Sequence, residues 1–264
     1  MRIASLQPSV TLTLASLGAL DTLCAHTKYC VDVLPELVDR GLPVLEDSWT
    51  TSTDELSAVA PDLVIASVPY RMESLAAILK AGFPLLALAP HTLADIAKDT
   101  RLIAAQVHKP AEAEVLIAAF QQTLATTKDI AHKLPSRPRV YCEEWGKPMI
   151  QSQAWIAELV EHASGDVVGD PGKQTTAEAV ASSDPDVLVF AWCGAGDRVP
   201  LRRVIEQRSW QQLRAVREGR VYCIPDEYLN TPSIPSLTEG IKHLSHAIHP
   251  EQFDRPARLI SLAC

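Results

Sequence analysis

Short apolar runs alternate with helical patterns along the whole chain. The apolar runs predict buried strands at 2–6, 21–27, 62–68 and 84–89 in the first half and at 139–144, 186–192 and 220–224 in the second half. Between them, apolar residues at helical spacing predict helices at 9–18, 53–60, 71–81, 92–106, 153–163, 175–182, 200–217 and 236–248. Such an alternation is typical of βαβ units, so we expect an α/β fold with mostly parallel sheets.

An internal repeat divides this pattern into two halves. Residues 51–66 (TSTDELSAVAPDLVIA) align without a gap with residues 175–190 (TTAEAVASSDPDVLVF) at an offset of 124 residues. In both copies a Ser/Thr cap with an acidic residue predicts the start of a helix, a Pro-Asp pair ends it, and a buried strand follows. The duplication predicts two tandem α/β lobes.

A long helix is expected between the lobes. Residues 109–134 contain no glycine, have their single proline in the first turn and are rich in strong helix formers. At about 1.5 Å per residue, such a helix spans roughly 35–40 Å. We therefore expect an N-terminal lobe at 1–108, a linking helix at 109–135 and a C-terminal lobe at 136–264. These would be two Rossmann-like lobes with a ligand cleft between them, and a single stiff connection limits their hinge motion.

Composition and charge narrow the class of protein. With a formal net charge of -8 over 264 residues, the chain lacks the basic surface that a nucleic-acid-binding protein needs. Its apolar runs are too short to span a membrane, and no secretory signal precedes the first strand. The cysteines lack a CxxC spacing, which favours reduced thiols over a disulfide framework or a zinc site: Cys24, Cys30, Cys142, Cys193, Cys223 and Cys264. Together these features predict a cytoplasmic protein, and a trimmed periplasmic or extracytoplasmic chain is the alternative.

The loops after the strands are the candidate binding site, because ligands of open α/β sheets bind at the carboxyl ends of the strands. Aromatic residues are scarce, yet six fall in these loops: Tyr29, Trp49, Tyr70, Trp145, Trp192 and Tyr228. Aromatic side chains offer large, rigid contact area to a flat or bulky ligand. Packing beneath its own loop is the alternative for each of them.

Catalytic and metal-binding patterns are weak. Cys30 could bind a soft metal through its thiolate or be a buried apolar residue. Three histidines recur on one predicted helix, where they could form a metal face or a polar edge: His243, His246 and His249. Glu143 and Glu144 are adjacent in a predicted strand and point to opposite faces, which excludes a cooperating acid–base pair. We therefore expect neither an enzyme nor a metal site.

Several segments, by their order and spacing, resemble one known family. They are 2–32 (RIASLQPSVTLTLASLGALDTLCAHTKYCVD), 46–67 (EDSWTTSTDELSAVAPDLVIAS), 153–165 (QAWIAELVEHASG), 209–229 (SWQQLRAVREGRVYCIPDEYL) and 236–253 (SLTEGIKHLSHAIHPEQF). Together with the long linking helix, they resemble the helical-backbone (class III) solute-binding proteins of ABC importers, and within them the vitamin B12 (cobalamin)-binding subfamily. Two stretches depart from the family pattern: 231–236 lacks an arginine, and 30–35 carries inserted residues.

The resemblance implies that cobalamin or a related corrinoid is the bound ligand, in the cleft between the lobes. By position, the ligand-binding residues would be Tyr29, Cys30, Trp49, Ser67, Val68, Trp145, Tyr228 and Asn230. The resemblance also implies that Glu73 docks the first lobe onto an arginine of an ABC permease. We expect a monomer that serves an importer or acts as a soluble corrinoid carrier.

Two alternatives stay open. The same fold could bind an iron-siderophore, haem or a transition-metal ion. Siderophore binders usually present several arginines, whereas the strand-end loops here offer chiefly Arg71 and Arg198. The chain could also be a cytoplasmic enzyme or regulator that handles corrinoids.

Overall fold

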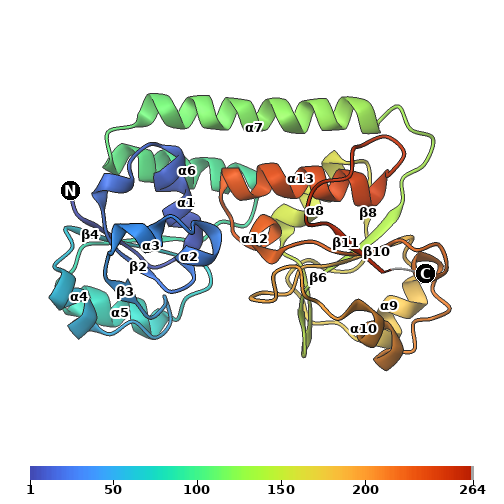
Figure 1. Cartoon of the computed structure of the whole chain (residues 1–264), viewed down its shortest axis with the longest axis horizontal. Coiled ribbons are helices and arrows are strands. Elements are labelled where there is room, and N and C mark those ends of the chain that lie inside the picture. Colours follow the sequence, from blue (N-terminus) through green and yellow to red (C-terminus); the bar gives the residue numbers. More distant parts are fainter. Residues whose placement is uncertain (263–264) are drawn as a thin grey trace. The chain divides into compact units, whose positions relative to one another are not determined.

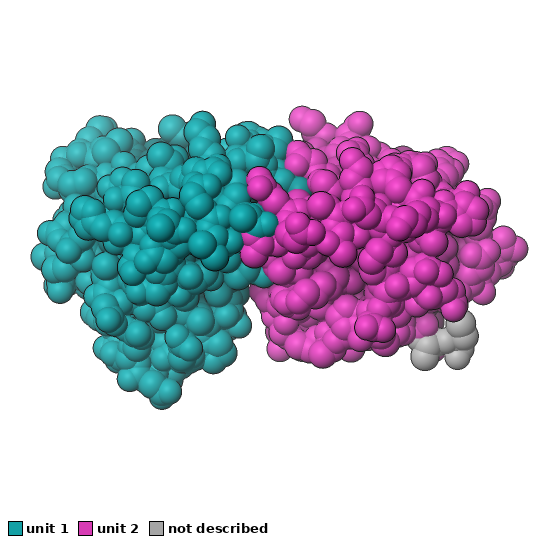
Figure 2. Space-filling view, turned by 90° about the horizontal axis from the view of Figure 1, so that it is seen from above, with its two compact units in different colours: residues 1–118, 232–235 teal, residues 119–231, 236–264 magenta. Residues whose placement is uncertain are grey.

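Each half of the chain contains a mainly parallel sheet with helices on its faces, as Figure 1 shows for a computed structural model that describes residues 1–262. Two compact units result (Figure 2): unit 1 comprises Met1–Ala118 with Pro232–Pro235, and unit 2 comprises Ala119–Thr231 with Ser236–Cys264. The predicted α/β class with two parallel-sheet lobes is confirmed.

The sheet of unit 1 has five parallel strands in the order β3-β2-β1-β4-β5. They are β1 (Ile3–Ser5), β2 (Leu23–Thr27), β3 (Val44–Leu45), β4 (Leu63–Ser67) and β5 (Leu85–Leu88). The surrounding helices are α1 (Pro8–Ser16), η1 (Leu20–Thr22), α2 (Cys30–Val33), α3 (Leu37–Arg40), α4 (Thr53–Val59), α5 (Met72–Lys80) and α6 (Leu93–Gln106). Every residue of β1, β2 and β4 is buried, which is why these central strands appear in the sequence as unbroken apolar runs.

Unit 2 has a sheet in the order β11-β10-β9-β6-β7, with β8 also paired to β6. Its strands are β6 (Arg139–Gly146), β7 (Met149–Gln151), β8 (Asp166–Val167), β9 (Val187–Phe190), β10 (Val221–Cys223) and β11 (Ile260–Ser261), of which β7 and β11 are antiparallel edges. Its helices are α8 (Ala154–His162), α9 (Ala177–Ser183), α10 (Leu201–Gln207), α11 (Arg214–Arg217) and α12 (Asp226–Leu229). Helix α13 (Ile234–Ile248) begins in residues assigned to unit 1 and continues in unit 2.

The predicted linking helix forms as α7 (Pro110–Ala131), 22 residues long with proline at its first position. The boundary between the compact units lies inside this helix, after Ala118, so the helix contributes residues to both units. Neither α7 nor any other helix in residues 1–262 is long and apolar enough to cross a membrane.

The sequence repeat has a structural counterpart in each unit, where a helix leads into an interior strand of the sheet: α4 into β4 and α9 into β9. Helices α4 and α9 both begin with a side-chain cap, in which the hydroxyls of Ser52 and Thr176 accept hydrogen bonds from the amides of Glu55 and Ala179, each at 3.2 Å. Each helix then ends in a left-handed residue, with φ of 45° in the first copy and 41° in the second. The repeat is therefore a complete helix unit with a defined beginning and end.

The aspartate of each Pro-Asp pair accepts a hydrogen bond from the backbone at the start of the neighbouring strand. Asp62 accepts a hydrogen bond from the amide of Arg2 at 2.7 Å, and Asp186 accepts one from the amide of Arg139 at 2.8 Å. In return, the two arginine guanidiniums donate to carbonyls in the last turns of α4 and α9, those of Val59 and Ser183. This exchange explains why Pro-Asp recurs at matched positions in the sequence.

The predicted helix at 200–217 is wrong in its middle. Helix α10 ends at Gln207, Ser209 has a left-handed φ of 56°, and α11 begins only at Arg214. The interruption lets Trp210, which is 1% exposed, enter the core, and lets Arg208 reach a buried carboxylate on β6. These tertiary contacts outweigh the helical preference of the local sequence.

Candidate functional site

The carboxyl edge of the unit 1 sheet carries an aromatic pair. Tyr29 follows β2 and Trp49 follows β3, and the two strands are neighbours in the sheet. The rings lie 6.0 Å apart between centroids at an interplanar angle of 29°. Tyr29 is 37% exposed and Trp49 is half-buried, so the pair offers a partly open aromatic surface. The two predicted ligand-binding residues are thus brought together.

The loop that carries Trp49 is held by its own side chains. The Asp47 carboxylate accepts hydrogen bonds from the amides of Trp49 at 3.0 Å and Thr50 at 2.7 Å, and from the Thr50 hydroxyl at 2.7 Å. The Ser74 hydroxyl of α5 donates to the Trp49 carbonyl at 2.8 Å. Because these hydrogen bonds fix the loop, binding there costs little conformational entropy.

A cluster of polar groups joins the segments that follow β1, β3 and β4 at the same edge of the sheet. The Gln7 amide donates to the Ser48 hydroxyl at 2.8 Å and to the Pro69 carbonyl at 3.0 Å, and the Ser48 hydroxyl donates to the same carbonyl at 2.5 Å. Of the other predicted contacts, Ser67 is only 2% exposed at the end of β4, and Val68 is half-buried. Ser67 therefore lies below the surface.

Cys30 lies inside the core of unit 1. Its thiol is 0% exposed, accepts a hydrogen bond from the Thr11 hydroxyl at 3.1 Å and lies 3.4 Å from the Thr27 hydroxyl. Burial raises the pKa of this thiol above its ordinary value. To coordinate cobalt, the thiol would have to leave the core and lose its proton.

In unit 2, Trp145 and Trp192 occupy the carboxyl ends of β6 and β9. Trp145 is 43% exposed, and its indole N–H donates to the Lys147 carbonyl at 3.0 Å. Trp192 instead lies against the backbone of Gly146, where an added Cβ would fall inside the indole ring. Trp145 is therefore available to a ligand, whereas most of Trp192 is used in packing.

A buried ion pair holds Trp192. The Glu143 carboxylate is 0% exposed and accepts two hydrogen bonds from the Arg208 guanidinium, both at 2.8 Å. It also accepts hydrogen bonds from the Tyr141 hydroxyl at 2.6 Å and from the Trp192 indole at 2.9 Å. Burial and then the Glu143 charge raise the pKa of Tyr141, so its phenol keeps the proton that it donates.

The loops after β9 and β10 are tied to each other. The Asp226 carboxylate accepts hydrogen bonds from the amides of Gly194 at 2.8 Å and Gly196 at 2.7 Å. The positive φ angles of the two glycines, 78° and 59°, allow both amides to turn toward one carboxylate. The loop after β9 is thereby anchored to the start of α12.

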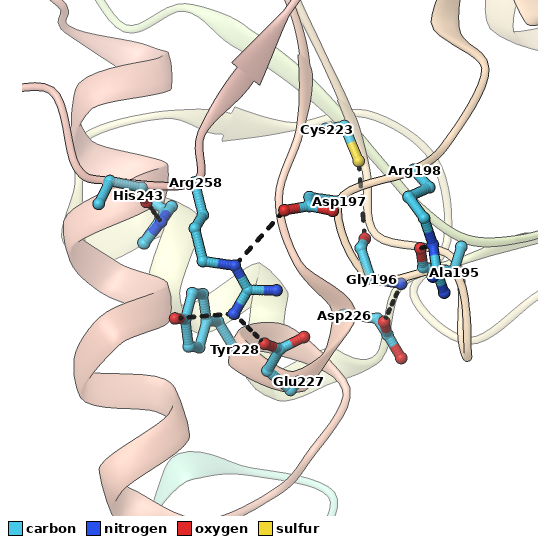
Figure 3. A network of polar contacts seen from close by, with 11 residues as sticks. Ala195, Gly196, Asp197, Arg198, Cys223, Asp226, Glu227, Tyr228, His243 and Arg258 are labelled. Atoms are coloured by element: carbon cyan, nitrogen blue, oxygen red, sulfur yellow. Dashed lines mark hydrogen bonds and ion pairs between the residues drawn. The ribbon is translucent and has the colours of Figure 1, made fainter. Parts of the chain in front are cut away.

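Arg258, in the C-terminal segment, also connects the loop after β9 with α12 (Figure 3). Its guanidinium lies 3.4 Å from Asp197 and 2.5 Å from Glu227, and donates to the Tyr228 hydroxyl at 3.3 Å. The Tyr228 ring also lies 4.9 Å from the ring of His243. Tyr228 is therefore held by intramolecular contacts on two sides, which the sequence did not reveal.

Glu144 and Asn230 lie near the exposed Cys193. The Gln153 amide donates to Glu144 at 2.6 Å, and burial raises the pKa of Glu144 to about 7. The Asn230 amide donates to the Ala191 carbonyl at 2.5 Å and to the Cys193 sulfur at 3.4 Å. Glu143 and Glu144 have entirely different partners, as their predicted opposite orientation requires.

The histidines of α13 are structural. His243 lies within hydrogen-bond distance of the carbonyls of Glu239 and Ala257, and His246 of the carbonyl of Phe253. Within residues 1–262 no three His, Cys, Asp or Glu side chains are grouped so that they could hold a metal ion. Glu73, the predicted docking residue, is exposed in the first turn of α5.

Comparison with known proteins gives the chain's relatives. Residues 3–228 match the family described as periplasmic binding protein. The chain is 26% identical over 267 residues, 96% of its own length and 81% of the relative's, to the uncharacterised ABC transporter substrate-binding lipoprotein YvrC of Bacillus subtilis (strain 168).

Two solved structures share the fold. A periplasmic haem-binding protein from Pseudomonas aeruginosa has a TM-score of 0.86 at 19% identity, covering 100% of this chain and 98% of that chain. The periplasmic vitamin B12-binding protein BtuF of Vibrio cholerae has a TM-score of 0.74 at 22% identity, covering 94% and 96%. At these identities the similarity shows the fold, not the ligand.

The predicted cytoplasmic location is wrong. The matching family is periplasmic and the relative is a lipoprotein, and both point to an extracytoplasmic protein. The cysteines misled the prediction: those within residues 1–262 are free, but all except Cys193 are buried, and buried structural thiols are chemically inert and therefore do not indicate the compartment. Cys264 lies outside the described residues.

Proposed function

The chain belongs to the periplasmic binding protein family, and we propose that it is the substrate-binding protein of an ABC transporter and that its ligand is cobalamin or a related corrinoid. The family and the relative are binding components rather than enzymes, in agreement with the predicted absence of catalysis.

One observation carries the proposal: the stacked pair of Tyr29 and Trp49 on a loop that is already ordered. A corrin ring is a broad, rigid macrocycle, and a partly exposed aromatic surface can cover its face or rim with little loss of entropy. The exposed Trp145 offers a similar surface in unit 2.

Haem is the second candidate, because the Tyr29–Trp49 surface also suits this flat macrocycle. Haem is also flat, but it carries two propionate carboxylates, which proteins usually bind with arginine. In the strand-end loops the exposed arginines are chiefly Arg71 and Arg198, and the Arg198 Nε already donates to the Ala195 carbonyl at 3.2 Å. This scarcity favours the corrinoid.

Titration calorimetry with cyanocobalamin and haemin tests the proposal, with Trp49→Ala as the variant. We expect wild-type protein to bind cyanocobalamin and Trp49→Ala to bind it at least about tenfold more weakly, a loss of about 1.4 kcal/mol. Val44→Ala is the matched control, because Val44 is 58% exposed on β3, which leads into the same loop. Failure of wild-type protein to bind cyanocobalamin at tens of micromolar would overturn the proposal, and binding of haemin alone would establish the second candidate.

We also propose that Glu73 docks unit 1 onto the permease. Its carboxylate is exposed in the first turn of α5, where a partner protein can reach it. Glu73→Lys should abolish uptake by the reconstituted transporter while leaving ligand affinity unchanged. Glu36→Lys, an equal charge reversal at another exposed position of unit 1, should keep uptake; equal loss in both variants would contradict the specific role.

A further inference from the structure

Glu144 lies where three neighbouring strands of unit 2 end. It stands near the end of β6, and its carbonyl accepts a hydrogen bond from the amide of Cys193, in the loop after β9. The loop after β10 adds Asp226, and the order β10-β9-β6 places the three ends side by side. Glu144 is half-buried, and the next residue is the exposed Trp145.

The Glu144 carboxylate is accessible to a ligand. One oxygen accepts from the Gln153 amide at 2.6 Å, and the other is not among the fully buried unpartnered atoms of residues 1–262, so a ligand can reach it. The adjacent Glu143 differs, because two Arg208 nitrogens, Tyr141 and Trp192 satisfy it fully. Burial disfavours the charged form of this carboxylate and raises the pKa of Glu144 to about 7.

The groups that face Glu144 are acceptors or acids. Gln153, just before α8, donates a hydrogen bond to it, and Cys193, in the loop after β9, is a titratable neighbour that also lies near Asp226. The amides of Gly194 and Gly196, in the loop after β9, donate to Asp226. The positive Arg208 is bound by Glu143, on the opposite face of β6. A ligand edge that donates hydrogen bonds fits this surface, and a carboxylate does not.

We propose that Glu144 contacts the ligand directly and accepts a hydrogen bond from a primary amide at the ligand's edge. This inference rests on the proposed function and names the chemistry that the site selects. The rim of a corrinoid carries several primary amides, whereas haem carries carboxylates in their place. Glu144 would therefore favour amide-bearing macrocycles and repel carboxylate-bearing ones.

The sign of the pH dependence distinguishes these two ligand chemistries. The ionised carboxylate accepts an amide hydrogen bond more strongly than the neutral acid does. Affinity for an amide-bearing ligand should therefore rise as the pH increases from 6 to 8. Because the Glu144 carboxyl ionises with a pKa of about 7, the rise should be up to about tenfold. For a ligand that presents a carboxylate, affinity should instead fall over the same interval, because like charges meet.

Calorimetric titration with cyanocobalamin at pH 6, 7 and 8 tests the contact. We expect the wild-type affinity to rise with pH and the Glu144→Gln affinity to stay flat, since the glutamine carbonyl still accepts a hydrogen bond but does not titrate. Glu161→Gln, the same charge loss at an exposed position of α8, should behave as wild type. A second ligand, cyanocobalamin with one amide hydrolysed to a carboxylate, should lose affinity as the pH rises.

The outcomes separate the two proposals. A wild-type affinity that is independent of pH, or a pH dependence that survives in Glu144→Gln, would overturn the Glu144 contact and leave corrinoid binding intact. No binding of cyanocobalamin by wild-type protein at any pH would overturn both.

Discussion

Removing Arg208 should destabilise unit 2 more than any surface substitution. The Arg208 side chain is 10% exposed and provides two of the four hydrogen bonds to the fully buried Glu143 carboxylate. Its guanidinium also lies 5.8 Å from the ring centroid of Phe190 and 4.9 Å from that of Trp210. Arg208→Ala therefore leaves a buried charge without its countercharge and opens a gap between two aromatic rings.

The size of the effect follows from these contacts. Breaking a buried ion pair by removing one partner costs about 3–5 kcal/mol, because the remaining charge stays desolvated. A domain of this size is stable by about 5–15 kcal/mol, so unit 2 would become marginal. Removing both charges is different: in Glu143→Gln/Arg208→Met the core keeps its volume without a bare charge, and we expect stability within about 2 kcal/mol of wild type.

Urea unfolding followed by tryptophan fluorescence measures this difference. Four of the five tryptophans lie in unit 2, so Trp49→Phe as a common background confines the signal to that unit. Arg208→Ala should lower the free energy of unfolding by about 3–5 kcal/mol, and the double variant should recover most of it. A loss below about 1 kcal/mol in Arg208→Ala, or a double variant less stable than the single one, would refute the reasoning.

Three further perturbations have definite expected results. Gly240→Ala should destabilise the protein by about 1–3 kcal/mol in thermal unfolding, because the new Cβ would overlap the Tyr228 carbonyl where α13 packs on α12; an unchanged midpoint would contradict that close packing. Asp99→Asn should stabilise unit 1 at pH 7.5 by about 1 kcal/mol and not at pH 4. Burial raises the pKa of Asp99 to about 6, so the folded state retains a proton that the unfolded state loses, and wild-type stability falls as the pH rises from about 4 to 6. Urea titrations at the two pH values check this, and an equal gain at both would oppose it. Ser52→Ala should cost about 1 kcal/mol by removing the capping box of α4, whereas Ser57→Ala, on the exposed side of the same helix, should cost less in the same assay.

The central strands could be predicted from the sequence because they are buried on both faces. Strands β1, β4 and β9 appear as unbroken apolar runs, and the repeated Pro-Asp marks where a helix ends and such a strand begins. Edge strands such as β7 and β11 have three and two residues, too few for any periodicity to show. The break after Gln207 depends on where the Trp210 and Arg208 side chains are accommodated, which only the folded structure determines.

The candidate site was predictable in position but not in detail. The rule that ligands bind at the carboxyl ends of strands located the loops of Tyr29, Trp49 and Trp145. It could not show that Cys30 lies in the core. Nor could it show that Tyr228 is held by Arg258, 30 residues further along the chain, since such partners leave no local pattern.

The identity of the ligand is the central claim, and native mass spectrometry of the protein purified from its own host tests it most directly. We predict that a fraction of the protein carries one corrinoid, and that Trp49→Ala purified in the same way carries less. A bound mass corresponding to haem or to an iron-siderophore, with no corrinoid, would contradict the account.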